Sequence, residues 1–159
     1  MNTMLLHDFA YVSVSAKRVC SRILDEDGVW LAGLAAAAMT EGDGLRLRVG
    51  PLGDVPLLGT TVKVHVGEPL ERDEVTVVPL TWKATTAPGL FPVMSADLEI
   101  APLDRELTQL TLRGRYTPPL GAVGRRLDRL LMHRIAEASV RAFLEQLVAM
   151  LSAGETARL

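Results

Sequence analysis

Three residues in this sequence have both the type and the position to recognise a ligand inside an apolar pocket. Arg134 falls near the middle of an apolar helical stripe. An unpaired charge there is costly, so Arg134 either reaches the rim, meets a carboxylate, or orients an acidic ligand head. Trp82 and Tyr116 fall on the apolar faces of predicted strands, and each carries one polar atom that needs a partner when buried. We therefore expect a mostly apolar pocket with few polar contacts.

The residue types that usually build catalytic or metal centres are scattered along the chain. His7, His65 and His133 lie far apart, and no His, Cys or carboxylate grouping has metal-ligand spacing. His133 is expected to point about 100° away from Arg134, toward water or a neighbouring element. Cys20 is the single cysteine, so no internal disulfide can form. We expect no metal, no cofactor and no nucleophilic serine or cysteine.

The bulk composition fits one ordinary globular domain. The 159 residues suffice for a single core, which we place at residues 1–151, with residues 152–159 as a frayed tail. The formal net charge of −2 argues against nucleic acid as the main partner. The start lacks a signal-peptide pattern, and the longest apolar stretch, residues 29–39, is too short to span a bilayer. We expect a cytoplasmic protein without integral membrane association.

The periodicity predicts strands that can position these residues. Alternation indicates strands at residues 8–15, 45–49, 60–67, 74–85, 93–101 and 106–117, and helical patterns follow at 17–24 and 29–39. After Pro118 and Pro119 a helix of about 30 residues is expected. Short turns favour an antiparallel meander, with the first strand pairing with the last. The fold class is therefore α+β: a curved antiparallel sheet of about six strands around a long C-terminal helix, with two short helices after the first strand.

The long helix carries two apolar stripes. Small residues cluster at its middle, so we expect its first half, through Leu131, to clamp the sheet, and its second half, from about Arg134, to roof a pocket. The second stripe should pack on the early helices, or alternatively join a subunit contact. The first stripe comprises Val123, Leu127, Leu130, Leu131, Ile135, Ala138 and Ala142, and the second Val140, Phe143, Leu144, Leu147 and Leu151.

Two stretches carry a resemblance to a known group. Residues 12–25 (VSVSAKRVCSRILD) look like an opening strand and first helix, and residues 116–147 look like an end-strand and grip helix. In this the chain resembles the START-like superfamily, the helix-grip fold, which includes plant allergens, lipid-transfer domains and polyketide aromatase/cyclases. The resemblance implies a cavity between sheet and helix that takes apolar small molecules.

The sequence thus predicts a domain that binds an apolar or weakly polar small molecule. One alternative is a polyketide cyclase-type enzyme that uses the same cavity, with Arg134 and Tyr116 as its working residues. Another is a ligand-free interaction module, such as a homodimer through the C-terminal helix. Leu90 and Phe91, at a predicted hairpin tip, are expected to act as a lid or to tuck under the helix end. The predicted ligand contacts are Trp82, Met94, Leu98, Leu112, Tyr116, Leu131, Arg134, Ile135 and Ala138.

Overall fold

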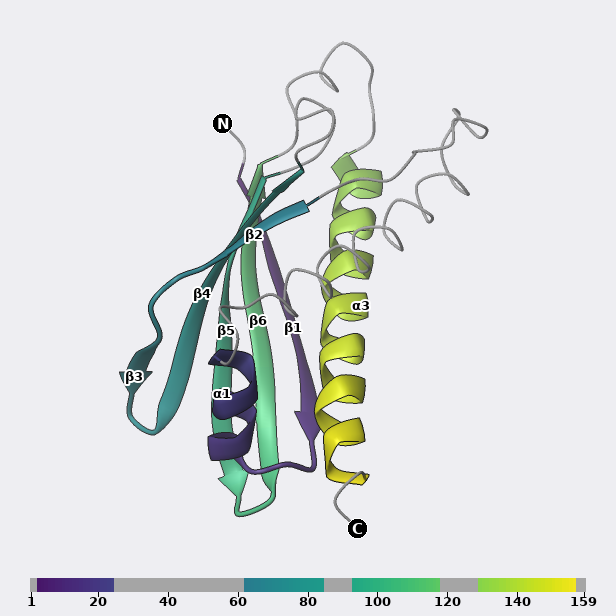
Figure 1. Cartoon of the computed structure of the whole chain (residues 1–159). Helices are drawn as coiled ribbons and strands as arrows, with labels where there is room; N and C mark the ends of the chain where they lie inside the picture. The colour runs from purple at the N-terminus through teal and green to yellow at the C-terminus, as the bar shows by residue number, and fades with distance from the viewer. Residues whose placement is uncertain (1–2, 25–61, 85–92, 118–128, 157–159) are drawn as a thin grey trace.

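The computed structural model describes residues 3–24, 62–84, 93–117 and 129–156, which form a curved antiparallel sheet with a long helix against it (Figure 1). The predicted helix at residues 29–39, the predicted strand at 45–49, and Leu90 and Phe91 lie outside the described residues. The α+β fold class predicted from the sequence, with its curved sheet and long C-terminal helix, is confirmed.

The sheet has six strands in the order β1-β6-β5-β4-β2, with β3 also paired to β4, and every pair is antiparallel. The predicted pairing of the first strand with the last is confirmed by the register from Met4↔Tyr116 to Val12↔Thr108. The strands are β1 (Met4–Val12), β2 (Val62–Val66), β3 (Leu70–Arg72), β4 (Val75–Ala84), β5 (Val93–Asp104) and β6 (Leu107–Thr117), and the helices are α1 (Ala16–Leu24) and α3 (Arg129–Thr156).

The first strand lies earlier in the chain than the sequence predicts. It begins at Met4 rather than at residue 8, because β6 is long enough to pair with Met4, Leu5 and Leu6, whose apolar run hides the alternation. It ends at Val12, before Ser15, whose hydroxyl accepts a hydrogen bond from the Arg18 amide at 3.4 Å. Ser15 therefore caps α1, as its position in the sequence predicts.

Helix α3 continues past the predicted start of the tail. It runs to Thr156, so residues 152–156 are helical rather than part of a frayed tail. The last turns are anchored to α1, because the Leu151 side chain is 1% exposed and its carbonyl accepts a hydrogen bond from Arg22 Nη1 at 2.6 Å.

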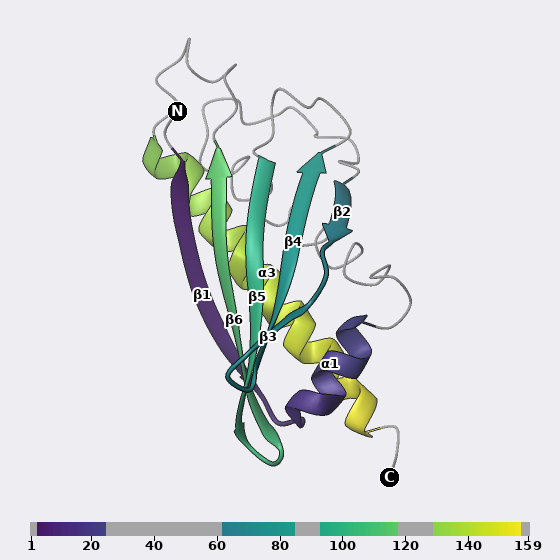
Figure 2. The same cartoon turned by 90° about the vertical axis from the view of Figure 1, so that its left-hand side faces the viewer.

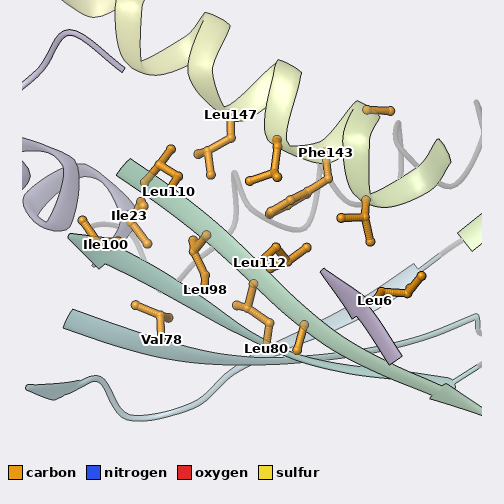
Figure 3. Packing of buried hydrophobic residues seen from close by; sticks show 14 of the residues in the cluster. Leu6, Ile23, Val78, Leu80, Leu98, Ile100, Leu110, Leu112, Phe143 and Leu147 are labelled. Atoms are coloured by element: carbon orange, nitrogen blue, oxygen red, sulfur yellow. The ribbon is translucent and has the colours of Figure 1, made fainter. Parts of the chain in front are cut away.

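The second stripe of α3 belongs to the hydrophobic core, together with Ala142 of the first stripe. Figure 3 shows Phe143 and Leu147 directed at the inner face of the sheet, above Leu110 and Leu112, with Ile23 of α1 beside them. The second stripe was predicted to point away from the sheet, and this is wrong, because its large side chains bury their apolar area against the sheet. The pocket under the second half of the helix stays a prediction. The predicted intramolecular packing of the second stripe is confirmed, and this face is not available for a subunit contact. Its buried residues are Val140, Phe143, Leu144, Leu147 and Leu151.

Candidate functional site

The inner face of the sheet is organised in rows of paired side chains across the strands, and its buried residues belong to one hydrophobic cluster. Tyr116 pairs with Met4 on one side and with Met94 on the other, so these three residues form one row across the sheet. Tyr116 and Met94 are 1% and 2% exposed. The sequence predicted both as ligand contacts, and the register brings them side by side.

The neighbouring row contains short side chains at its centre. Gly114 pairs with Leu6 and with Ala96. A methyl group added at Gly114 would meet Met94 Sδ at 3.4 Å and the Cβ atoms of Ala96 and Leu6 at 3.7 Å, which are ordinary contact distances. The side chain of Met94 thus lies over Gly114, and this row combines two small residues with a flexible neighbouring side chain.

The next row belongs to the filled core. Leu98 and Leu112 face each other across β5 and β6, and both are 0% exposed. They belong to the same cluster of buried residues as Phe143 and Leu147 of α3 (Figure 3). Leu98 and Leu112 were predicted as ligand contacts. In the structure they also have a packing role, which is sufficient to explain their burial.

Tyr116 carries a buried polar atom on this inner face. Its hydroxyl donates a hydrogen bond to Met4 Sδ at 2.8 Å, and a thioether sulfur is a weak acceptor. Burial, and secondarily the negative charge of Glu137, raise the pKa of Tyr116 to about 12. The phenol thus stays protonated at neutral pH and can donate a hydrogen bond to a better acceptor.

His133 lies against Tyr116, which the sequence analysis did not predict. The two rings are stacked, with centroids 6.4 Å apart and planes 25° apart. His133 Nε2 lies 3.2 Å from Glu137 Oε1, one helical turn further on. His133 Nδ1 is buried and has no hydrogen-bond partner in the described part of the chain. We call Met4, Tyr116, His133 and Glu137 the tyrosine–histidine cluster.

The remaining predicted contacts are only partly placed by the structure. Arg134 is exposed, so its guanidinium does not lie inside the core, and Ala138 is half-buried. The Trp82 backbone pairs with Met94, but its side chain lies outside what the structure describes, as do those of Leu131 and Ile135.

A surface groove lies away from the tyrosine–histidine cluster. It has a volume of about 500 Å³ and lies between α1 and the β3–β4 hairpin, with Lys17, Cys20, Glu71 and Glu74 among its lining residues. Figure 2 shows α3 crossing behind the sheet, from the end where β6 finishes to the end where α1 lies. The groove is therefore at the α1 end, and Tyr116, next to the end of β6, is at the other.

The described residues contain no group of three or more His, Cys, Asp or Glu side chains that could hold a metal ion. Within that same part of the chain, no helix is long and apolar enough to cross a membrane. The outer face of the sheet carries charged side chains with cross-strand pairing, such as Arg113 Nε to Glu99 Oε1 at 3.3 Å. It also exposes Leu5, Phe9 and Tyr11 on β1.

Comparison with known proteins identifies the fold. No family model matches the sequence, and no curated protein matches it. Among solved structures, the chain is similar to the ZhuI aromatase/cyclase from Streptomyces sp. R1128, with 16% identity, 94% of each chain covered and a TM-score of 0.51. A START superfamily protein from Mycobacterium smegmatis gives 14% identity over 92% of this chain and 96% of that chain, with a TM-score of 0.53. A conserved protein from Geobacillus kaustophilus gives 9% identity over 94% and 96%, with a TM-score of 0.56.

Proposed function

We propose that this chain, which has the START-like helix-grip fold, holds a small and largely apolar molecule between the inner face of its sheet and the N-terminal half of α3. The observation that carries the proposal is Tyr116, a buried phenol whose hydroxyl donates to a thioether sulfur within the described residues. A buried polar group with such a weak partner has hydrogen-bonding capacity left for a ligand.

The packing supports placing the site at the Tyr116 end of the sheet. At the α1 end, the inner face is covered by α1 and by the second half of α3, through residues such as Ile23 and Leu147. At the Tyr116 end, the inner face has two small residues, Gly114 and Ala96, beside the flexible side chain of Met94. Ligand pockets are mostly apolar with a few placed polar groups, which is the composition found here.

In this proposal, most of the contacts predicted from the sequence keep their role. Met94 supplies an adaptable wall beside Tyr116. Trp82, Leu131, Ile135 and Ala138 are proposed as further contacts. Arg134 is exposed, so it contacts only an acidic group that the ligand leaves near the surface. Leu90 and Phe91 remain a proposed lid.

Placing a larger side chain at Ala96 tests this location. Replacing Ala96, which is 4% exposed on the inner face, by leucine should weaken the binding of an apolar fluorescent dye such as N-phenyl-1-naphthylamine at least tenfold, because the larger side chain takes up the space of the dye. The dissociation constant is measured by fluorescence titration of the purified chain.

Ser95→Leu is the matched control, because Ser95 is the preceding residue of β5 and is exposed on the outer face. It adds a leucine to the same strand and should leave dye affinity unchanged. Equal dye affinity in Ala96→Leu and the unchanged chain would rule out this location for the site. Native mass spectrometry of protein purified from cells then tests whether a molecule is carried there.

The second candidate function is a polyketide cyclase-type enzyme in the same site. The observation that favours it is the His133–Glu137 pair beside Tyr116, since an imidazole held by a carboxylate is a usual form of general base. Cells that make an uncyclised polyketide should then give a changed product pattern when this chain is present, as measured by liquid chromatography and mass spectrometry. The same pattern with and without the chain would count against the enzyme and leave the binding function in place.

A further inference from the structure

The two ring nitrogens of His133 have different surroundings. Nε2 lies 3.2 Å from Glu137 Oε1. Nδ1 is buried, and within the described residues it has no hydrogen-bond partner. Most buried polar atoms in native proteins have a partner, and leaving one without a partner destabilises the fold. An unpartnered nitrogen on the ring that stacks on Tyr116 therefore needs an explanation.

The Glu137 contact determines which kind of partner Nδ1 can accept. An ionised carboxylate only accepts hydrogen bonds, so the 3.2 Å approach of Nε2 to Glu137 Oε1 favours the proton on Nε2. In the neutral imidazole the other nitrogen then has a free lone pair, which makes Nδ1 an acceptor. Its missing partner is a hydrogen-bond donor. Glu137 acts here as a positioning residue, because it fixes the ring and its tautomer.

Tyr116 provides the complementary group. Its O–H is directed at Met4 Sδ, a weak acceptor that an oxygen atom can replace. The stacked rings of Tyr116 and His133 thus present one donor and one acceptor beside the buried apolar side chain of Met94. A hydroxyl group of a ligand can satisfy both, because it can donate to Nδ1 and accept from the phenol.

We propose that the tyrosine–histidine cluster recognises a hydroxyl group on an apolar ligand, of the phenol or enol class, which donates a hydrogen bond to His133 Nδ1 and accepts one from Tyr116. This inference rests on the proposed binding function and makes it more specific. It separates the expected ligands from hydrocarbons and simple esters of similar size, which have no hydroxyl proton to donate. Specificity of this kind is strong when the protein would otherwise bury an unpaired polar atom.

The test compares two probes that differ in one methyl group, 1-naphthol and 1-methoxynaphthalene. The methyl ether keeps the oxygen as an acceptor but has no proton to donate. Isothermal titration of the unchanged chain should show about tenfold tighter binding of 1-naphthol. In His133→Phe, which keeps a flat ring and removes Nδ1, this preference should fall to about the intrinsic difference between the probes. The matched control, His65→Phe, changes an exposed histidine of β2 and should keep the preference.

The possible outcomes separate this inference from the proposed function. If both probes bind and His133→Phe has the same preference as the unchanged chain, the hydroxyl inference is wrong while the binding site stands. If neither probe binds the unchanged chain, both proposals fail. If His133→Phe does not fold, nuclear magnetic resonance of the unchanged chain tests the inference instead. The quantity measured is the nitrogen-15 chemical shift of His133 Nδ1. It should shift with 1-naphthol and not with 1-methoxynaphthalene, and equal responses to the two probes would overturn the inference.

Discussion

Replacing Phe143 by alanine is expected to lower the free energy of unfolding by about 3–5 kcal/mol. The Phe143 side chain is 1% exposed and belongs to the buried cluster between α3 and the sheet (Figure 3). Truncation removes most of a large apolar side chain and leaves a cavity that the surrounding strands can only partly fill. Urea unfolding followed by circular dichroism measures the change.

The matched control for Phe143 is Met150→Ala, on the same helix. Met150 is 49% exposed, so its truncation should change the free energy of unfolding by less than about 1 kcal/mol. The comparison tests the assignment of the second stripe as the core face. A loss below about 1 kcal/mol for Phe143→Ala as well would mean that this stripe does not form the core.

The arrangement of the sheet could be predicted because alternation is a direct consequence of strand geometry. Along a strand, every second residue faces the same side of the sheet. Met94 and Leu98 of β5 and Leu112 of β6 are apolar examples on the inner face, and the structure buries all three. The pairing of β1 with β6 followed from the short turns between the other strands. The start of β1 could not be read in the same way, because Met4, Leu5 and Leu6 are all apolar and show no alternation.

The direction of the second stripe of α3 was predicted wrongly for a related reason. Both stripes of the helix are apolar, so periodicity alone does not say which one meets the sheet. The alanines of the first stripe suggested free space over the sheet. The structure instead places Phe143 and Leu147 there, because large side chains fill the gap between helix and sheet more completely.

This assignment also explains why His133 was missed. If the first stripe is taken as the face toward the sheet, the His133 side chain points away from the sheet. Counted from the second stripe, it falls seven residues before Val140, and it also falls three residues before the buried Ala136, so it lies on the core-facing side. The signal was therefore present in the sequence. Tyr116 could be predicted because its strand face was read correctly, whereas its contact with Met4 depends on where β1 begins.

The tyrosine–histidine cluster should make the stability of the protein fall at high pH. Burial and the charge of Glu137 raise the pKa of Tyr116 from 10.0 to about 12. Below about pH 10 the phenol is protonated in the folded and the unfolded chain, so its contribution is constant. Between these two pKa values only the unfolded chain loses the proton, and stability falls as pH rises. The loss from this one group approaches about 2–3 kcal/mol near pH 12.

Tyr116→Phe should remove this contribution to the pH dependence, because phenylalanine has no proton to lose. The measurement is urea unfolding at several pH values between 9 and about 12, in which the difference between the two proteins isolates Tyr116 from other titrating groups. The chain has only two tyrosines, and Tyr11 is 54% exposed, so Tyr11→Phe is the matched control and should keep the extra loss of stability. The ultraviolet absorbance of the phenolate in Tyr11→Phe should then appear near pH 12. If Tyr116→Phe and the unchanged chain lose stability in parallel over this range, the phenol is not held in the buried environment on which the proposed site depends.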